Sequence, residues 1–421
     1  MKIYKFGGAS VKDADGVKNV AQIISYNNQH NLLVVISAMG KNTNALERLV
    51  NACYHNNKQG YEILQEIKTS HQTLINELLG NSASMWMNEV ENLFLELECL
   101  IDNNNLLDDY DFLYDQIVCY GELISTRIVS AYLLSIGIRN QWVDARNFII
   151  TDSRYRDARV QWEETERIVT NRLLPLSQKN LIITQGFIGK GEKGETTTLG
   201  REGSDYSAAI FGKLLHAESV SIWKDVNGVM NADPKKFSES VIIPELTYND
   251  AIELAYYGAS VIHPKTVQPL KASNIPLFVR SFINQDNQGT KVSNSSSTLA
   301  VPCKILKENQ LMLEISTADF NFIAEDNLQQ IFQIMSKNKV RLNIMQNSAI
   351  HFRCIIDNKE NQHLPLQNEL SELGLNVNVT NDLKLLSIYQ PGNEKIEEYS
   401  GELGAVILKQ HVGNAAHFVL R

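Results

Sequence analysis

The sequence predicts an α/β protein with a three-layer, mostly parallel β-sheet, followed by a smaller α+β region. Short runs rich in Val and Ile alternate with longer helical patterns through the first two-thirds of the chain, as in parallel sheets buried on both faces. Glycine loops follow several of these runs, as at Gly7-Gly8 and Gly186. Beyond residue 301 the order becomes β-α-β-β-α-β, which is typical of a ferredoxin-like unit.

The elements of the first region follow from the spacing of apolar residues. Strands are expected at Ile3–Phe6, Leu32–Ser37, Gln141–Val143, Leu181–Thr184, Val220–Trp223 and Pro276–Val279. Helices are expected at Asp15–Asn27, Tyr114–Ser135, Glu163–Leu174 and Asn249–Tyr257. Residues 61–111 read as a helical insertion without recognisable chemistry, either a helical hairpin or a dimer contact.

Turn-forming residues between Asn284 and Val301 indicate a boundary between a first domain, 1–292, and a second, 302–421. In the second domain we expect strands at Leu311–Ser316, Val340–Met345, Ile350–Ile356 and Asn376–Val379, and helices at Asn327–Lys337 and Leu364–Leu373. A second copy of the unit begins at Leu383–Tyr389, and we predict that it is incomplete.

Composition excludes several classes of function. The net charge of −9, with no long Lys/Arg block, argues against a nucleic-acid partner. There is no run of eighteen apolar residues and no signal-peptide pattern at the N-terminus, so we predict no membrane span. Five scattered cysteines without a C-x-x-C pair fit reduced thiols in the cytoplasm and give no metal site.

The stretch Thr196–Asp205 carries the clearest chemistry. It reads T-T-T-L-G-R-E-G-S-D and leads into a helix expected at Tyr206–His216, with Ser204 as its N-cap. A glycine loop that opens a helix presents free N–H groups to an anion, and Arg201 can grip a carboxylate or phosphate with two hydrogen bonds. The stretch therefore predicts an anion site.

Five segments, in order, resemble the aspartokinases of the amino-acid kinase superfamily. They are Lys5–Val11; Ser37-Ala38 with Thr43-Asn44; Gly121-Glu122; Gln185–Gly189 leading to Thr196–Asp205; and Trp223–Pro234 with Glu253–Pro264. The likeness covers residues 1 to about 292, and the remainder resembles the ACT-type regulatory region of these kinases.

The resemblance implies transfer of a phosphoryl group from ATP, with Mg²⁺, to the side-chain carboxylate of L-aspartate. This is the first step towards lysine, threonine and methionine. The chemistry is consistent, because a carboxylate acceptor is already ionised and needs no general base, so catalysis reduces to positioning and charge neutralisation. No dedicated metal cage is visible. The resemblance also implies a homodimer or higher homo-oligomer.

The resemblance assigns roles residue by residue. Lys5 contacts the ATP phosphates beside Gly7 and Gly8, and Asp205 orients Lys5 or a metal-bound water. Arg201 holds the α-carboxylate of the substrate and Glu122 its α-ammonium. Further substrate contacts fall to Ser37, Thr43 and Ser204.

The nucleotide segment departs from the family pattern. Asp225 is kept, but Lys224, Met230, Lys235 and Ser260 replace frequent Thr, Tyr, Arg and Lys residues, and Glu202 replaces a common Gly. Our hypothesis is that Lys224 supplies the positive charge missing at Ser260. His263, before Pro264, is expected to be a structural residue at a helix end.

Two questions stay open at this stage. The loop Asn343, Ile344, Met345, Gln346, Asn347 and Ser348 can meet an amino-acid effector such as lysine or threonine, or the second domain can serve dimerisation alone. The alternatives to an aspartate kinase are a kinase for another small amino acid, such as glutamate, and a non-catalytic effector-binding relative.

Overall fold

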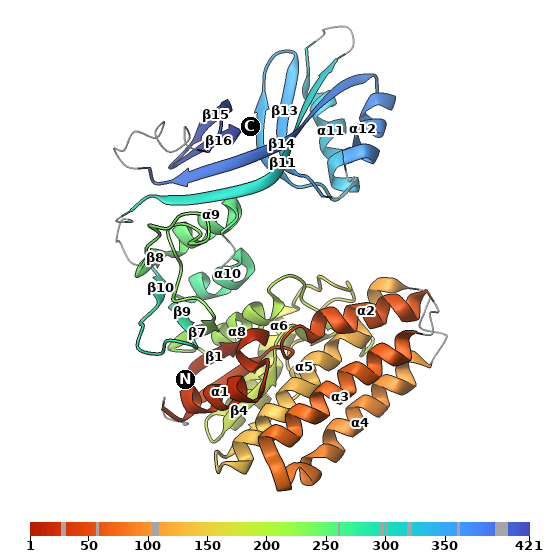
Figure 1. Ribbon diagram of the computed structural model, residues 1–421, viewed down its shortest axis with the longest axis vertical. Helices are drawn as coiled ribbons and strands as arrows, with labels where there is room; N and C mark the ends of the chain where they lie inside the picture. Colours follow the sequence, from red (N-terminus) through yellow and green to blue (C-terminus); the bar gives the residue numbers. More distant parts are fainter. Residues whose placement is uncertain are drawn as a thin grey trace. The chain divides into compact units, whose positions relative to one another are not determined.

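The computed structural model describes residues 1–26, 31–55, 59–102, 109–259, 262–294, 299, 301–317, 322–359, 363–391 and 403–421. The chain divides into two compact units (Figure 1). The first comprises Met1–Val229, Ile242–Ile252 and Val261–Ser297, and the second Met230–Val241, Glu253–Ser260 and Thr298–Arg421. Two short segments, 230–241 and 253–260, thus group with the C-terminal part of the chain.

The first unit is built on an eight-stranded sheet with the order β3-β4-β2-β1-β7-β9-β10-β8. Its strands are β1 (Lys2–Phe6), β2 (Leu32–Ile36), β3 (Asn140–Trp142), β4 (Leu181–Gln185), β7 (Ser219–Lys224), β8 (Glu245–Thr247), β9 (Leu277–Ser281) and β10 (Thr290–Ser293). All neighbours are parallel except β9 and β10. The six strands expected from the sequence are confirmed to within two residues, and so is the parallel α/β class.

Helices cover both faces of this sheet, which gives the three layers expected. They are α1 (Ala14–Tyr26), α2 (Asn42–Tyr54), α3 (Gln59–Leu79), α4 (Ala83–Ile101), α5 (Tyr110–Ser135), α6 (Trp162–Ile168), α7 (Leu174–Ser177), α8 (Gly203–Leu214), α9 (Tyr248–Tyr257) and α10 (Pro264–Ala272). A π-helical turn, Val169–Leu173, joins α6 to α7, and a small antiparallel pair, β5 (Ile188–Lys190) and β6 (Thr196–Thr198), precedes α8.

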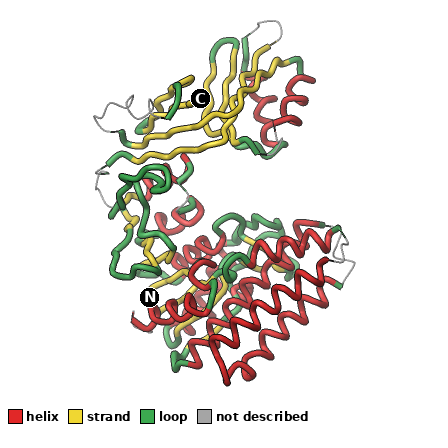
Figure 2. Tube along the Cα trace, viewed as in Figure 1, coloured by secondary structure: helices red, strands yellow, loops and turns green. Residues whose placement is uncertain are grey.

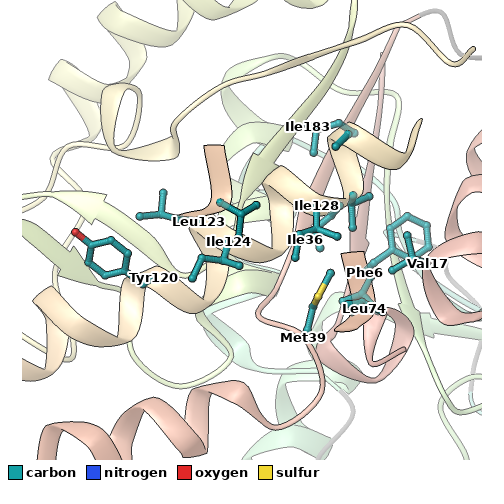
Figure 3. Packing of buried hydrophobic residues seen from close by; sticks show 14 of the residues in the cluster. Phe6, Val17, Ile36, Met39, Leu74, Tyr120, Leu123, Ile124, Ile128 and Ile183 are labelled. Carbon is teal, nitrogen blue, oxygen red and sulfur yellow. The ribbon is translucent and has the colours of Figure 1, made fainter. Parts of the chain in front are cut away.

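The predicted insertion is a helical hairpin. Helices α3 and α4 pack against each other and beside α5 (Figure 2). One continuous core joins this hairpin to the sheet, and Figure 3 shows Phe6 and Ile36 of the strands close to Leu74 of α3 and Ile128 of α5. The insertion therefore enlarges the hydrophobic core.

Helix α5 runs through the centre of this core. Its length and hydropathy would allow it to cross a membrane, but 83% of its most apolar window is buried inside the unit. Two carboxylic residues, Asp115 and Glu122, are buried on it. We therefore interpret α5 as the core helix of the first unit.

The second unit contains a six-stranded antiparallel sheet with the order β12-β13-β11-β14-β16-β15. Its elements are β11 (Cys303–Thr317), α11 (Glu325–Lys337), β12 (Leu342–Asn347), β13 (His351–Asp357), α12 (His363–Glu372), β14 (Leu375–Tyr389), β15 (Val406–Val412) and β16 (Ala415–Leu420). Ile331 and Leu366 of the two helices share a core with Leu313 and Phe352 of the sheet. The ferredoxin-like order is confirmed.

The expectation of a separate strand at Leu383–Tyr389 was wrong. Residues 375–389 form one long strand that pairs with the whole of β11, with irregular register near Gln310. The outer strands β12 and β15 approach each other, since Gln346 Nε2 donates to Lys409 O (3.3 Å) and Gln410 Nε2 donates to Met345 O (3.2 Å). The sheet therefore curls towards a half-barrel.

Candidate functional site

The centre of the site is a buried cluster of two lysines and one aspartate. Lys5 is the penultimate residue of β1, and its Nζ lies 2.5 Å from Oδ1 of Asp205. Lys224, at the end of β7, places its Nζ 3.2 Å from Oδ2 of the same carboxylate. Strands β1 and β7 are adjacent and parallel, so both lysines reach the carboxyl edge of the sheet, where open α/β sheets bind ligands.

The charges in this cluster support one another. Asp205 is fully buried and Lys5 is 6% exposed. Burial would raise the pKa of Asp205, but Lys5 and Lys224 outweigh burial and hold that pKa below its ordinary value. Burial likewise opposes the charge on Lys224, yet Asp205 and Glu202 raise its pKa. The two lysines thus keep Asp205 ionised, and Asp205 in turn favours the charged form of Lys224.

Helix α8 starts earlier than the sequence predicted. It spans Gly203–Leu214, its N-cap is Glu202, and that residue makes no side-chain capping bond. The prediction of Ser204 as N-cap was therefore wrong, and Asp205 is the third helical residue. Glu202 has φ 54, a left-handed conformation that favours glycine. Its carboxylate lies 3.7 Å from Lys224 Nζ. Apart from this contact, nothing in the described structure explains why a glutamate stands at this position.

The loop after β2 packs tightly against the glycines after β1. A Cβ on Gly8 would lie 2.7 Å from the carbonyl oxygens of Ala38 and Gly40, so only glycine fits there. Gly7 lies next to Lys5, with 3.6 Å between its Cβ position and Nζ. The carbonyl of Ser37 accepts a hydrogen bond from Ser125 Oγ of α5 (2.7 Å). These contacts fix the loop that carries the predicted substrate residues.

The helical hairpin also supports this loop. Asn42, next to the half-buried Thr43 in the first turn of α2, places its Nδ2 3.1 Å from Nε2 of His71 on α3. His71 is 2% exposed, and burial lowers its pKa. The insertion therefore contributes a neutral histidine behind the loop, which the sequence did not reveal.

Glu122 is the most unusual group in the site. It is 2% exposed, and its Oε1 accepts a hydrogen bond from Ala38 N (3.2 Å). Its Oε2 is buried and has no hydrogen-bond partner in the part of the chain that the structure describes. Burial raises the pKa of Glu122 to about 8, although the Ala38 amide and Lys5 act in the opposite direction. Such a carboxyl favours the arrival of a cation.

The remaining residues predicted for the first unit differ in exposure. Arg201 is exposed in the turn before α8, while Ser204 is buried at 8% exposure. Asp225 follows β7 and is exposed. His263 is the N-cap of α10, since its Nδ1 accepts from Lys265 N (3.2 Å). The expectation of a structural role at a helix end is confirmed.

Three residues predicted to contact ATP lie outside the first unit. Met230 is half-buried and Lys235 is exposed, and both belong to the second unit. Ser260 lies outside the described residues. Our hypothesis that Lys224 supplies the charge missing at Ser260 therefore stays a prediction.

The predicted effector loop is part of β12 and the turn after it. Asn343 is bonded on three sides, because its amide donates to Gln310 (2.7 Å) and Asp357 (2.8 Å) and its oxygen accepts from Lys307 (2.8 Å). Met345, Asn347 and Ser348 are exposed, and Gln346 is half-buried. Only the exposed end of this loop is therefore open to a ligand.

Sequence reasoning missed Asp115. Its carboxylate is fully buried and accepts hydrogen bonds from Thr198 N (2.8 Å), Thr198 Oγ1 (2.6 Å) and Arg156 N (3.1 Å). Two helical turns separate it from Glu122 on α5. The available signal was an acidic residue inside an otherwise apolar helix, on the same face as a predicted site residue.

The described residues contain no group of three or more His, Cys, Asp or Glu side chains arranged to hold a metal. Asp205 is the carboxylate nearest to the lysine pair, and both of its oxygens face ammonium groups. This donor set does not fit a protein-built Mg²⁺ site.

Comparison with known proteins shows which family this chain resembles. A model of the amino acid kinase family matches residues 1–281. Lysine-sensitive aspartokinase 3 of Escherichia coli is 32% identical over 360 residues, which cover 84% of this chain and 78% of that protein. Aspartokinase 1 of Arabidopsis thaliana chloroplasts is 32% identical over 372 residues, covering 84% and 63%. The chain spans 35% of the Arabidopsis bifunctional aspartokinase/homoserine dehydrogenase 2, to which it is 32% identical.

Solved structures extend the likeness to both units. E. coli aspartokinase III in complex with aspartate and ADP has a TM-score of 0.84 at 29% identity, with 100% of this chain and 96% of that chain covered. The same enzyme in complex with lysine and aspartate has a TM-score of 0.83 at 28% identity and the same coverage.

Proposed function

The chain belongs to the amino acid kinase family and, within it, to the aspartokinases, and on that premise we propose that it phosphorylates the side-chain carboxylate of L-aspartate with ATP. The product is 4-phospho-L-aspartate, which leads towards lysine, threonine and methionine. Support comes from relatives named aspartokinase and from a structural neighbour that holds aspartate and ADP.

One observation carries the proposal for this chain. A buried carboxyl group with an unpartnered oxygen, Glu122, lies in the same unit as the lysine pair Lys5 and Lys224. The first is suited to an α-ammonium group and the second to phosphate oxygens. A phosphorylated amino acid carries both groups.

Each substrate group then has a partner. Glu122 holds the α-ammonium, and the exposed Arg201 turns inward to hold the α-carboxylate with two hydrogen bonds. Ser37 of the β2 loop, Thr43 of the first turn of α2 and Ser204 at the start of α8 supply further polar contacts. The side-chain carboxylate of aspartate is thereby directed towards the lysines.

Phosphoryl transfer requires that negative charge on the transferred group be neutralised while the reacting oxygens stay aligned. Lys5 and Lys224 contribute two ammonium groups, and Asp205 holds both in fixed positions, so little reorganisation is needed. Gly7 and Gly8 allow the backbone to approach the phosphates. Because the acceptor is already ionised, no side chain has to remove a proton.

Mg²⁺, when bound to ATP, adds positive charge on the phosphate oxygens. Since Asp205 is occupied by two lysines, we infer that the metal is carried by the nucleotide and by water. Asp225 is a further proposed nucleotide contact, whereas for Met230, Lys235 and Ser260 such a contact stays a prediction from the sequence.

The direct test is a trap for acyl phosphate. Purified protein, ATP and Mg²⁺ are incubated with hydroxylamine and with L-aspartate, L-glutamate or no acceptor, and the hydroxamate is measured. We expect hydroxamate with L-aspartate alone. Product with L-glutamate would identify a kinase for that acid, and no product from folded protein would identify a non-catalytic relative.

We further propose that the second unit binds an amino-acid effector and takes part in a homodimer. A neighbour in complex with lysine supports the first point, and the exposed residues Asn347 and Ser348 beside Met345 and Gln346 offer polar groups to it. Adding lysine or threonine to the hydroxamate assay tests this. All five cysteines are free thiols, which fits the cytoplasmic location we propose.

A further inference from the structure

The buried carboxylate of Asp115 ties three parts of the first unit together. It projects from α5, accepts both the amide and the hydroxyl of Thr198 at the end of β6, and accepts the amide of Arg156. Its two oxygens thus serve three donors. An asparagine could not do this, because its amide nitrogen only donates.

The segments held by Asp115 form the base of the Arg201 turn. Thr198 is followed by Leu199, whose amide donates to Phe187 O (2.8 Å), and the turn closes where Gly203 N donates to Gly200 O (3.0 Å). A Cβ on Gly200 would lie 2.7 Å from Asp157 Oδ1 and 3.0 Å from Arg156 O. The turn therefore rests on the 156–157 segment that Asp115 also anchors.

Helix α5 places Asp115 and Glu122 on one face. Seven residues are two helical turns, or about 10 Å along the axis. One rigid helix therefore carries Glu122 directly and supports the turn of Arg201 through Thr198. Burial raises the pKa of Asp115 to about 6, although Thr198 and Arg156 oppose the change. A buried carboxyl retained despite this cost is typical of a functional constraint.

We propose that Asp115 is a positioning residue that fixes Arg201 relative to Glu122, so that one amino acid can engage both at once. This inference rests on the proposed aspartate site. Asp115 touches neither substrate nor nucleotide, and its effect passes through Thr198 to the Arg201 turn. Loss of the contact therefore weakens binding of the amino acid and leaves binding of ATP unchanged.

A matched pair at Thr198 provides the test. Thr198→Ser keeps the hydroxyl that donates to Asp115, whereas Thr198→Val removes it with little change in size. We expect Thr198→Val to raise the KM for L-aspartate about 10-fold, with the KM for ATP within twofold of wild type and Thr198→Ser like wild type. Asp115→Asn should raise the KM for L-aspartate further, and melting curves identify any variant that fails to fold.

A double variant tests whether the effect of Thr198→Val on the KM for L-aspartate depends on Arg201. In an Arg201→Ala background, Thr198→Val should add little to the KM for L-aspartate, since the group it positions is gone. A full additional 10-fold effect would overturn the proposal, and so would equal KM values for Thr198→Val and Thr198→Ser.

Calorimetric titration with L-aspartate separates this proposal from the proposed function. If the wild type neither binds nor phosphorylates L-aspartate, both are wrong. If the wild type does both and the Thr198 pair is equal, only the role of Asp115 is wrong.

Discussion

Two carboxyl groups, the buried Glu122 of the first unit and the half-buried Asp357 of the second, have opposite properties. Glu122 of the first unit has an unpartnered oxygen, and burial raises its pKa to about 8. Burial also acts to raise the pKa of Asp357 in the second unit, but hydrogen bonds from Gln310 and Asn343, together with Lys307, outweigh it and lower that pKa. Burial acts in the same direction on both groups, but it leaves a neutral acid at Glu122, whereas the partners of Asp357 outweigh it and keep a carboxylate.

The difference lies in the partners. Asp357 belongs to a network within the protein, since Gln310 and Asn343 both donate to it, Asn343 also donates to Gln310, and Lys307 donates to Asn343. Such a network stabilises a fold and leaves little for a ligand to add. Glu122 lacks a partner for one oxygen and therefore favours the binding of a cation that donates a hydrogen bond to that oxygen. We therefore expect substitutions at the two places to change different measurable quantities.

The largest effect is expected at Glu122. Glu122→Gln removes the anionic partner of the substrate ammonium, a loss of about 3–5 kcal/mol for a buried pair. The value of kcat/KM for L-aspartate should fall about 100- to 5000-fold, while the melting temperature is not lowered. Glu89→Gln, at an exposed pair with Arg127, is the control. A Glu122→Gln enzyme with unchanged kcat/KM would remove the basis for our substrate orientation.

Lys224→Ala should have the next largest effect. It removes one of two ammonium groups beside Asp205, a loss of about 1.5–3 kcal/mol for a hydrogen bond to a charged group. We expect the KM for ATP to rise about 10- to 100-fold, measured by initial rates at saturating aspartate. Lys213→Ala, whose ammonium lies 4.3 Å from the Trp162 ring, should leave this KM unchanged. If Lys224→Ala left both KM and kcat unchanged, Lys224 would not supply the charge missing at Ser260.

A smaller effect is expected in the pH dependence. The pKa of Glu122 rises from the ordinary 4.5 to about 8 in the free protein, so its neutral form prevails at pH 7 and must lose its proton when an ammonium binds. Calorimetry at pH 7, in buffers of different ionisation enthalpy, should detect release of about one proton per L-aspartate. Affinity should increase between pH 6 and 8 and level off above.

The same shift determines how stability depends on pH. Because the folded pKa is raised, the stabilisation due to neutral Glu122 is complete below pH 4.5 and is lost as the pH rises through about 8. Glu122→Gln should lack this loss, so its advantage in melting temperature over wild type should grow between pH 5 and 9. A constant difference would contradict the assigned cause.

In the second unit, only stability should change. Gln310→Ala removes a 2% exposed side chain that bonds Asp357 and Asn343, and we expect a loss of about 1–3 kcal/mol in the free energy of unfolding. Denaturant titration measures this, with the exposed Asn378→Ala as control. Without effector, kcat for aspartate phosphorylation should stay within twofold of wild type. A large fall in kcat would show that the network has a second role.

The sequence predicted the sheet well because each parallel strand is a short apolar run with a loop on either side. Long-range pairing was harder to foresee. Residues 375–389 read as two strands because polar residues near Asp382 interrupt the apolar pattern, yet one strand crosses this interruption. The start of α8 was misplaced because Ser204 has a typical capping side chain, whereas the chain turns at Glu202.

Within the site, the motif residues Lys5, Asp205 and Lys224 could be predicted, since glycines and strand ends surround them. The ion pair of Lys5 with Asp205 could not, because it joins residues 200 positions apart. His71 could not be recognised either, and the only signal for Asp115 was its acidic side chain within an apolar helix. Each lies on a helix that resembles an ordinary core helix. The role of each depends on a distant residue, Asn42 for His71 and Thr198 for Asp115, that approaches only in the folded chain.

The way the chain divides constrains how such proteins can exchange parts by gene recombination. Tyr257 packs its ring 4.9 Å from that of His417, and Lys236 pairs with Glu308 at 2.7 Å, so segments encoded before residue 261 complete the C-terminal unit. A crossover at residue 298 would import the six-stranded sheet without the pieces that it packs against. Viable chimeras should therefore inherit 230–241 and 253–260 from the same parent as the tail.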